Sequence, residues 1–541
     1  MAKLHEYQAK EILRAHGIET PRGRVVFSAE EASKVAENLG GKVVVKAQIH
    51  STSRAAKGGI KFANSPEEAK RVTSEMLGKL IGENFCEAVL IEEKLEIEQE
   101  FYLGFIIDTV LKRPILIFSE VGGSGIEERA ETTKKLVCSV RREPEIQQIK
   151  QICSDERIAS VLQKLYRVAK SCEARSAEIN PLALLKNGKI FALDCRISVD
   201  DYAVFRHPDL PIEIPRELGH TPTKLEKIAW EVEKNDYRGT FYFVEILQED
   251  ESKIKIGFHG AGGGGSMASL DAAQAVGLKP ACYVDTSGSP PASKIYRAAR
   301  IILSIPGIRG YFLSGSGVAS QEQFILARGI IKAFLEVKPK IPAVLRLGGN
   351  GEEVAKELVE KYARFLPAPM EAYQKIHSAE FCASRLKDLI QAFESNKNQS
   401  EQPCKNTSKQ GAKINEQNQV TPNSEAVAEK GFEETHERAF DSSLPKPFFS
   451  TSADAKLYEF KTRTGRIIFN HSVFSTESAA KIVESCPTKI LKLSERNLPV
   501  LAIEPEEAER GKCIECLACE FASWESGIGG VKIEFPIKNL A

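Results

Sequence analysis

A cluster of basic side chains and glycines follows a short β-branched run near the N-terminus. Lys46 ends the run, and His50, Arg54, Lys57 and the pair Gly58–Gly59 come after it. Phosphate groups are bound by cationic side chains and by backbone amides that approach closely, and glycine permits the closest approach. Such a stretch can supply both, so a site for a phosphorylated ligand is one interpretation of these residues. A solvated basic loop is the alternative.

A second group of polar residues combines carboxylates with an amide. Glu178, Asn180 and Pro181 stand close together, and Asp194 follows on the next expected strand. Mg²⁺ takes hard oxygen ligands and bridges phosphate groups, so an Asn carbonyl and an Asp carboxylate on adjacent strands suit it. Asn180 and Asp194 are candidate magnesium ligands, with an ordinary Asn–Pro turn as the alternative.

Two turns of small residues, His259–Gly265 and Ser314–Ala319, each precede an expected helix. The N-terminus of a helix binds anions through free backbone N–H groups and through the helix dipole. These turns are therefore candidate anion sites. Glycines that serve tight strand-to-helix turns are a compatible explanation.

Four cysteines near the C-terminus could hold a metal centre. Cys513, Cys516 and Cys519 form a C-x-x-C-x-x-C run, and Cys486 is followed by Pro487. In bacterial ferredoxins three thiolates of such a run bind one cluster and a Cys-Pro supplies the fourth. A zinc site would favour two C-x-x-C pairs. The spacing predicts one 4Fe–4S cluster, with zinc as the alternative. The other cysteines are scattered singly, as reduced thiols in a core would be.

The elements that must position these residues alternate between strand and helix. Expected strands in the first part are Lys42–Ala47, Ala88–Ile91, Phe101–Ile107 and Ile115–Phe118, with a helix over Glu67–Gly82. A second series has strands at Ile254–Phe258, Ala281–Val284 and Gly310–Leu313, with helices over Ser266–Val276 and Ser293–Leu303. Strand, small-residue turn and helix in repetition predict a doubly wound parallel sheet. Near the C-terminus we expect a hairpin, Lys456–Phe460 with Arg466–Phe469, and a helix over Thr476–Val483.

Length and composition set the wider limits. The 541 residues suggest about three to four domains, and 74 basic residues balance 74 acidic ones. That balance argues against a dedicated nucleic-acid binder. The N-terminus has no signal-peptide pattern, and no apolar run reaches the ~20 residues of a membrane span. We expect a cytoplasmic protein without a membrane span. Residues 394–446 have almost no large apolar side chains, which predicts a disordered linker.

In order along the chain, these segments resemble the β subunit of ADP- or GDP-forming succinate–CoA ligase. The resemblance covers roughly residues 1–392. It rests on LHEYQAKEIL, VVVKAQIH with KGGIKF, EEKLEIEQEFYLG, VGGSGIEE, AEINPLAL and FRHPDL. It implies an ATP-grasp domain and a flavodoxin-like CoA-ligase domain.

The resemblance also implies a role for individual residues. Lys46 and Arg54 would contact the phosphates of ATP or GTP, and Glu92 and Glu100 would lie at the nucleotide's hinge and ribose. Asn180 and Asp194 would hold Mg²⁺. Glu178 would be catalytic, steadying a phosphohistidine of the partner α subunit. Gly317, Val318 and Ala319 would open a helix that faces this phosphohistidine and the acyl carboxylate. His259 stands where the family has a substrate-contacting Asn.

The reaction implied is a relay in which nucleotide phosphorylates the partner histidine, phosphate passes to a carboxylate, and CoA displaces it. CoA would be bound mainly by the partner subunit. Two departures from the family pattern concern ligands. Residues 51–55, STSRA, lack three glycines of the family's phosphate loop. Residues 285–290 and 313–317 are more similar to ATP-citrate lyase, so succinate, malate, citrate, a sulfonated acid and other dicarboxylates all stay open as substrates.

The C-terminal segments GKCIECLACEFASW and ESGIGGVKIEFPI resemble the small ferredoxin-like FixX family. That resemblance implies an electron-transfer flavoprotein or another redox protein as partner. We therefore expect an α/β chain with four parts: an ATP-grasp domain over 1–225, a flavodoxin-like domain over 236–392, a disordered linker over 393–450 and an α+β ferredoxin-like domain over 455–541. The alternative function is a non-catalytic or weakly catalytic ligase-like scaffold that serves electron transfer or docking.

Overall fold

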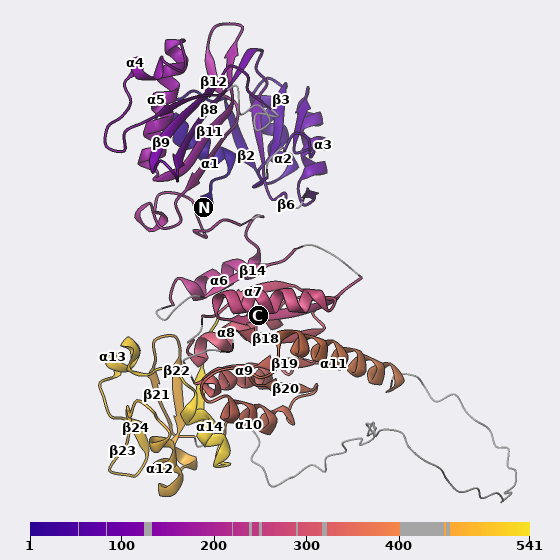
Figure 1. The fold of residues 1–541 in the computed structure, drawn as a ribbon, viewed down its shortest axis with the longest axis vertical. Helices are drawn as coiled ribbons and strands as arrows, with labels where there is room; N and C mark the ends of the chain where they lie inside the picture. The colour runs from indigo at the N-terminus through magenta and orange to yellow at the C-terminus, as the bar shows by residue number, and fades with distance from the viewer. Residues whose placement is uncertain are drawn as a thin grey trace, which may run out of the picture. The chain divides into compact units, whose positions relative to one another are not determined.

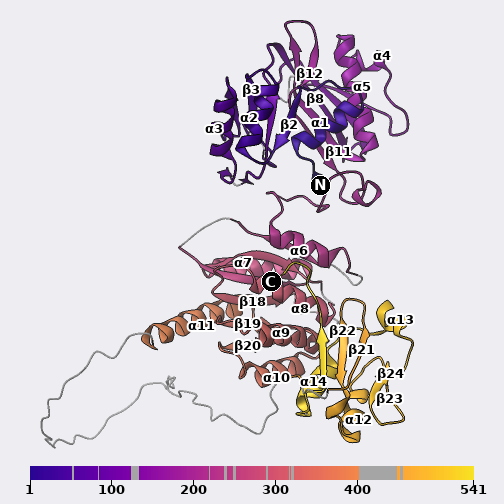
Figure 2. The ribbon, with the colours of Figure 1, turned by 180° about the vertical axis from the view of Figure 1, so that it is seen from behind.

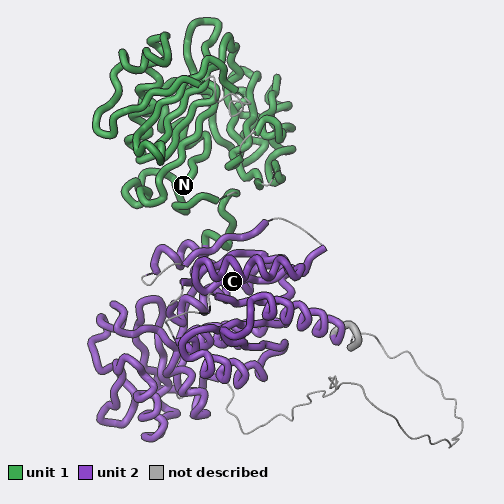
Figure 3. The backbone as a smooth tube through the Cα atoms, viewed as in Figure 1, with its two compact units in different colours: residues 1–227 green, residues 228–541 purple. Residues whose placement is uncertain are grey.

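The structure is a computed structural model, and its fold is drawn in Figure 1. It describes residues 1–51, 54–82, 84–123, 133–218, 220–236, 241–247, 252–287, 290–315, 317, 322–400 (397–400 without side chains), 448–450 and 455–540. The chain divides into two compact units, unit 1 with residues 1–227 and unit 2 with residues 228–541 (Figure 3).

Unit 1 begins with a small antiparallel sheet. Its strands, in spatial order, are β2 (Gly23–Val26), β7 (Val89–Glu93), β3 (Val43–Ala47) and β4 (Ile60–Ala63). Helices α2 (Ala29–Asn38) and α3 (Pro66–Met76) pack together beside it. Each helix starts at a serine cap, Ser28 or Ser65, whose hydroxyl accepts a hydrogen bond from a first-turn amide. The β-branched run in β3 is almost fully buried, which fits its prediction as a strand.

A larger antiparallel sheet forms the rest of unit 1. Its order is β1 (Ala2–Lys3), β13 (Cys195–Val199), β11 (Ala174–Leu185), β8 (Ile97–Asp108), β9 (Arg113–Ser119) and β10 (Lys134–Val137), with β12 (Ile190–Ala192) paired to β11. Helices α1 (Glu6–Ala15) and α5 (Glu156–Ser171) cover its apolar face, with the short α4 (Ile146–Ile149) beside α5. In the register of β11 and β8, Glu178 lies opposite Gly104, so the predicted acid is set in the middle of a sheet.

Unit 2 contains a mostly parallel sheet, as predicted. The order is β14 (Tyr242–Glu245), β17 (Cys282–Asp285), β15 (Ile254–Ala261), β18 (Gly310–Gly315), β19 (Ala343–Arg346) and β20 (Met370–Tyr373), with β16 (Leu278–Pro280) at the start of β15. The pairing of β14 with β17 is antiparallel. The helix α6 (Lys224–Glu233) leads into this region.

Helices cover both faces of this parallel sheet. They are α7 (Gly263–Ala275), α8 (Ala292–Leu303), α9 (Gln323–Val337), α10 (Glu352–Ala363) and α11 (Ala379–Ser400). Phe258 and Phe312 point into the core beneath α7 and α11. Tyr311, one residue before Phe312, points to the opposite face and packs edge-on against Phe334 of α9. This alternation is the period-2 pattern of strands that are buried on both sides.

The predicted boundary of the linker at residue 393 is wrong. Helix α11 continues to Ser400, because adding a residue to an existing helix costs far less than starting one. Residues 401–447 of the predicted linker lie outside the described residues, and its last three residues, 448–450, are described.

The C-terminal part of unit 2, residues 448–540, is called the cysteine domain below, and residues 228–400 the parallel-sheet domain. The predicted hairpin is confirmed as β21 (Leu457–Lys461) and β22 (Arg466–Asn470), and β25 (Val531–Glu534) completes the sheet. The predicted helix is α12 (Thr476–Glu484), and further elements are β23 (Leu491–Leu493), β24 (Pro499–Leu501), α13 (Pro505–Glu507) and α14 (Ala518–Glu525). Both ribbon views place α14 beside α9 and α10 (Figures 1 and 2). Among the described helices, none is long and apolar enough to cross a membrane.

Candidate active site

A cavity of about 620 Å³ in unit 1 is lined by residues of both its larger sheets. Pockets for small molecules commonly measure roughly 300–1,000 Å³. The polar lining includes every nucleotide, magnesium and catalytic residue that the sequence predicts in this unit. These are Lys46, Arg54, Glu92, Glu100, Glu178, Asn180 and Asp194. The fold thus brings residues from four separate segments to one place.

Lys46 lies near the end of β3, next to Glu92 on the neighbouring strand β7. Its ammonium nitrogen is 2.8 Å from Glu92 Oε2, and it donates a hydrogen bond to the Leu193 carbonyl oxygen at 2.5 Å. Burial alone would lower the pKa of Lys46, but the carboxylates around it outweigh burial and raise that pKa above its ordinary value. Lys46 is therefore a fixed cation in the cavity wall.

Two charged residues of α1, Glu6 and Lys10, complete this buried network and were not predicted from the sequence. Lys10 Nζ lies 2.8 Å from Glu6 Oε1 and 2.5 Å from Glu92 Oε1, and both side chains are about 2% exposed or less. Burial would raise the pKa of Glu6, but Lys10, Lys46 and Arg54 together hold it well below its usual range. Glu6 and Lys10 stand at i and i+4 on the helix face of Ala9 and Leu13. Charges within an apolar stripe were the signal that could have revealed them.

Arg54 connects this network to the predicted magnesium site. Its Nη2 atom lies 2.7 Å from Glu6 Oε2 and 2.6 Å from Asp194 Oδ2. The other oxygen of that carboxylate, Asp194 Oδ1, is buried and accepts no hydrogen bond from the part of the chain that the structure describes. A buried carboxylate oxygen without a donor is chemically suited to a cation.

Asn180 is held next to Asp194 by a backbone hydrogen bond: the Asn180 backbone N–H donates to the Asp194 carbonyl oxygen at 3.0 Å. Its side chain forms two hydrogen bonds with the backbone of Gly123. Asn180 Oδ1 accepts from the Gly123 amide at 2.7 Å, and Asn180 Nδ2 donates to the Gly123 carbonyl oxygen at 3.2 Å. An amide oxygen has two lone pairs, so Asn180 Oδ1 retains capacity for a metal. The residues present therefore fit Mg²⁺, for which Asp194 would be the anionic ligand.

Glu178 lines the large cavity and also a second, smaller one of about 230 Å³. Tyr102 donates a hydrogen bond to Glu178 Oε2 at 3.3 Å, and Arg196 Nε lies 3.8 Å from Glu178 Oε1. About a third of the side chain is exposed. Glu178 is thus a carboxylate positioned between two cavities and accessible to a ligand.

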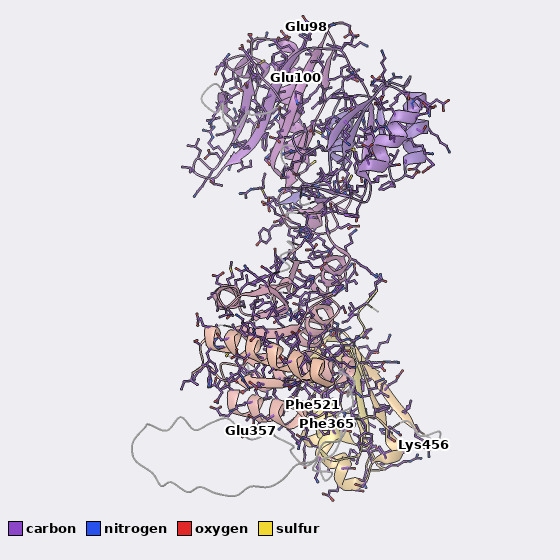
Figure 4. All side chains as sticks on the ribbon, turned by 90° about the vertical axis from the view of Figure 1, so that its right-hand side faces the viewer. Glu98, Glu100, Glu357, Phe365, Lys456 and Phe521 are labelled. Carbon is purple, nitrogen blue, oxygen red and sulfur yellow. The ribbon has the colours of Figure 1, made fainter. Side chains whose placement is uncertain are left out.

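Glu100 lies on β8 at the cavity and is labelled in Figure 4. Its carbonyl oxygen accepts from the Gly122 amide at 3.0 Å. A Cβ atom on Gly123 would come within 3.1 Å of Glu100 Oε2, so the Glu100 carboxylate lies directly against Gly123, to which Asn180 is hydrogen-bonded. Most of the predicted loop VGGSGIEE, from residue 124 onward, lies outside the described residues.

The expectation that His259 contacts substrate does not fit its position in unit 2. The side chain is fully buried, with Nδ1 2.5 Å from the Tyr311 hydroxyl and Nε2 3.2 Å from the Thr286 hydroxyl. Burial lowers the pKa of His259 to about 3, so the ring is neutral at physiological pH. Both ring nitrogens face protein groups, and His259 is a core residue here.

The two predicted anion sites of unit 2 differ. At the start of α7, the Gly262 and Gly263 amides donate to the Asp285 carboxylate at 3.3 and 2.9 Å, so a side chain already occupies these donors. Gly317, after β18, has a left-handed φ of 74°, and a Cβ there would lie 3.2 Å from Arg346. Val318 and Ala319 lie outside the described residues.

The four predicted cysteine ligands, Cys486, Cys513, Cys516 and Cys519, line one small cavity in the cysteine domain. Cys513, Cys516 and Cys519 are buried, and Cys486 is partly exposed. Within the described ranges, no three His, Cys, Asp or Glu side chains converge tightly enough to hold a single metal ion.

The backbone and electrostatics of this loop are both unusual. Burial raises the pKa of Cys513 to about 12 and that of Cys519 well above its ordinary value, and the nearby cysteine thiolates add to both effects. The residues flanking Cys516, Glu515 and Leu517, have φ values of 52° and 62°. Left-handed non-glycine residues cost roughly 1–2 kcal/mol each, and such strain is common at ligand sites. Four thiolates could share this space only with positive charge among them.

Comparisons with known proteins support the resemblance to succinate–CoA ligase β subunits. A family model described as an ATP-grasp domain matches residues 3–184. The chain is 36% identical over 385 residues to the GDP-forming succinate–CoA ligase subunit β of Thermus thermophilus, a match that covers 69% of this chain and 97% of that protein. It is 34% identical over 378 residues to the ADP-forming subunit β of Geobacillus kaustophilus, covering 66% of this chain and 94% of that protein.

A solved structure with a similar fold is ATP citrate lyase from Methanothrix soehngenii in complex with citrate and coenzyme A. The TM-score is 0.57 at 18% identity, and the match covers 72% of this chain and 99% of that one. At this identity the likeness concerns the fold alone.

Proposed function

Because the chain belongs to the family of succinate–CoA ligase β subunits, we propose that it is the nucleotide-binding subunit of an acid–CoA ligase that works with an α-type partner subunit. The reaction joins a di- or tricarboxylic acid to CoA at the expense of ATP or GTP. The observation that carries the proposal is the cavity of unit 1, where the predicted phosphate, magnesium and catalytic residues meet.

Lys46 and Arg54 are the proposed phosphate contacts. Both are buried cations paired with carboxylates, and both line the cavity. Incoming phosphate oxygens would replace part of that pairing. Glu92, which is 2% exposed and bound to Lys10 and Lys46, orients Lys46, and Glu100 is the better placed carboxylate for a ribose hydroxyl.

Asn180 and Asp194 would hold Mg²⁺, which when bound neutralises charge on the transferred phosphoryl group. Glu178 receives the partner's histidine. Its carboxylate lines the nucleotide cavity and the smaller cavity beside it, so an imidazole entering from the smaller side would meet both Glu178 and the nucleotide. A carboxylate at that point orients the ring and stabilises its positive charge while the phosphoryl group is transferred.

In unit 2 the order of the parallel strands, β17, β15, β18, β19 and β20, supports assignment of the parallel-sheet domain as flavodoxin-like. Ligands of such sheets bind at the carboxyl ends of the strands. Gly317 follows the carboxyl end of β18, which supports a role for Gly317, Val318 and Ala319 near the phosphohistidine and the acyl carboxylate. The acid itself, and the choice between ATP and GTP, are left to assay.

The cysteine domain is the proposed site of one 4Fe–4S cluster, in a fold similar to small ferredoxins. Four thiols around one buried, mainly apolar cavity suit a centre that spreads its ligands over four irons, and they suit it better than a single zinc ion. When bound, the cluster would supply one-electron chemistry. An electron-transfer flavoprotein or another redox protein would be its partner.

The test is co-expression of the chain with an α-type subunit from the same genome. Purified complex should form ADP or GDP in a reaction that needs both CoA and one member of a panel of carboxylic acids. Transfer of labelled phosphate from nucleotide to the α subunit, without CoA, tests the first half-reaction separately. A complex that assembles but neither labels nor turns over would favour the non-catalytic scaffold.

A further inference from the structure

The cysteine domain is joined to the parallel-sheet domain by buried cations on two helices of the latter. Lys332 of α9 is 3% exposed and lies 2.9 Å from Glu520 Oε1, next to Cys519 on α14. The same ammonium group contacts Glu336 Oε1 at 2.9 Å. Glu520 Oε1 also accepts from the Ile533 amide at 3.1 Å. One cation of the parallel-sheet domain is thus inserted into the cysteine domain.

Arg328, one helical turn before Lys332, reaches the cysteine loop itself. Its Nη1 atom donates to the Cys516 carbonyl oxygen at 3.4 Å, and its guanidinium lies 5.9 Å from the ring centre of Phe521. Burial lowers the pKa of Arg328, and the Cys516 and Cys519 thiolates act against that effect. Arg328 Nε is buried and donates to no acceptor among the residues described. Figure 4 labels Phe521, where α14 meets this part of the unit.

A third cation, Arg297 of α8, acts on the loop through Thr464. Arg297 Nη1 donates to the Thr464 hydroxyl at 2.8 Å, and its guanidinium lies 5.2 Å from the ring centre of Phe535. Thr464 in turn donates from its hydroxyl to Glu515 Oε2 at 2.6 Å and from its amide to Glu515 Oε1 at 2.7 Å. Glu515 lies between Cys513 and Cys516 and is 1% exposed. The backbone around Cys516 is therefore fixed from the neighbouring domain.

The contact of Arg328 with the Cys516 carbonyl oxygen places positive charge where a thiolate centre needs it. A centre with four thiolates is anionic, and each added electron makes it more so. Nearby fixed cations favour the reduced state, and their effect is large where water is excluded. An arginine is suited to this task because it stays protonated even when buried.

We propose that Arg328 is a positioning residue for the four-cysteine centre and that its charge raises the centre's reduction potential. The parallel-sheet domain thereby sets a property of the cysteine domain, and the two act as one redox unit. The inference rests on the cluster proposed above.

The test compares Arg328→Gln with Arg328→Lys in the full chain, purified without oxygen. Lys356→Gln, on the solvent-facing side of α10, is the matched control that removes one positive charge at the surface. Iron and sulfide content is measured first, and the midpoint potential then follows from a redox titration read by EPR. We expect Arg328→Gln to shift the potential to more negative values, Arg328→Lys to keep the potential near the wild-type value, and Lys356→Gln to leave it unchanged.

The outcomes separate the inference from the cluster itself. A wild-type chain without iron overturns both. If Arg328→Gln contains as much iron as the wild type and has the same midpoint potential, the inference is overturned and the cluster assignment stands. If Arg328→Gln loses iron, retention of iron by Arg328→Lys supports the charge requirement. If Arg328→Gln and Arg328→Lys both lose iron, the charge requirement is overturned, because Arg328 then contributes through packing and not through its charge.

Discussion

Asp194 and Arg54, 140 positions apart in the chain, form an ion pair with 2.6 Å between Oδ2 and Nη2. The pair joins the proposed magnesium ligand to a proposed phosphate contact. Arg54 is thus paired with Asp194 as well as with Glu6. A cation bound at Asp194 would take this carboxylate away from Arg54. A phosphate group of the nucleotide would then take the place of the carboxylate beside Arg54. Binding of magnesium and nucleotide should thus be coupled.

Replacing Asp194 with Ala should abolish this coupling. The change removes the one anionic ligand proposed for Mg²⁺, and loss of several kcal/mol of charge stabilisation lowers ligase turnover by about 100-fold or more. The fold should survive, because Arg54 keeps its second partner, Glu6, at 2.7 Å. Turnover of the complex and the magnesium dependence of nucleotide binding are the measurements. Asp271→Asn, an exposed site on α7, is the control. Near-normal turnover in Asp194→Ala would refute the metal assignment.

Replacing Glu178 with Gln should separate nucleotide binding from phosphoryl transfer. The amide keeps the size and the hydrogen bond from Tyr102 but loses the charge that faces the histidine. Labelling of the α subunit by nucleotide should slow by about 100-fold, while the nucleotide dissociation constant changes little. Rapid-quench labelling and calorimetry measure the two quantities. Glu173→Gln, an exposed ion-pair residue, serves as the control. Equal losses in binding and labelling would instead indicate a binding residue.

The buried His259 predicts how the stability of unit 2 depends on pH. In the unfolded chain this histidine takes up a proton below about pH 6.5, whereas in the folded chain its pKa is about 3. The unfolded state therefore binds more protons in this window, and stability falls as pH falls, by about 1.4 kcal/mol per unit from this residue. His259→Gln removes the titrating group and retains donors and acceptors for Tyr311 and Thr286.

Urea denaturation between pH 6.5 and 5 measures this difference. Both tryptophans of the chain, Trp230 and Trp524, lie in unit 2, so tryptophan fluorescence follows its unfolding. The wild-type unfolding free energy should fall more steeply with decreasing pH than that of His259→Gln. Other groups, such as Glu520 with its raised pKa, titrate in both proteins and cancel in the comparison. Parallel pH profiles would show that His259 is not the source.

Local patterns in the sequence were sufficient to predict strands, turns and the groups of residues that could bind phosphate or metal. The run at β3 reads as a buried strand from its β-branched residues alone, and Asn180 with Asp194 follows from the ligand preference of Mg²⁺. The strand is confirmed, whereas the magnesium assignment stays a prediction from residue types. That Lys46 and Asp194 would line the same cavity required the resemblance to a family.

Long-range partners of charges could not be predicted in the same way. Glu6 and Lys10 appear as an ordinary i, i+4 pair on a helix, and only the packing of α1 against two sheets shows that they are buried with Glu92. His259 was assigned from its position in a family pattern, but its neighbours Tyr311 and Thr286 come from other strands and loops. Lys332 likewise meets Glu520 across 188 positions of the chain.

Replacing Cys516 with Ser should remove the proposed cluster. Wild-type chain purified without oxygen should contain about four irons and four sulfides and should be brown. The variant should lose most of both, because a hydroxyl is a poor substitute for a thiolate and the flanking backbone is strained for this site. Cys172→Ser, a buried thiol in unit 1, is the control and should retain full iron. Colourless wild-type protein with stoichiometric zinc would refute the cluster.

The ion pair of Lys332 and Glu520 should hold the cysteine domain against the parallel-sheet domain. Lys332→Met leaves the Glu520 carboxylate buried, and the Ile533 amide remains as a hydrogen-bond donor to it. Removing one partner of a buried pair costs about 3–5 kcal/mol, mostly because the other charge stays desolvated. The single variant should therefore unfold at much lower urea concentration than wild type.

The double variant Lys332→Met with Glu520→Gln removes both charges and keeps an acceptor for Ile533, so much of the lost stability should return. Trp524, 5.9 Å from the Tyr362 ring centre across the same contact, reports the transition in a Trp230→Phe background. Lys361→Met, whose partner Glu525 is exposed, should cost less than about 1 kcal/mol. If the double variant is no more stable than Lys332→Met, the cost arises from packing of the lysine chain and not from the unpaired carboxylate.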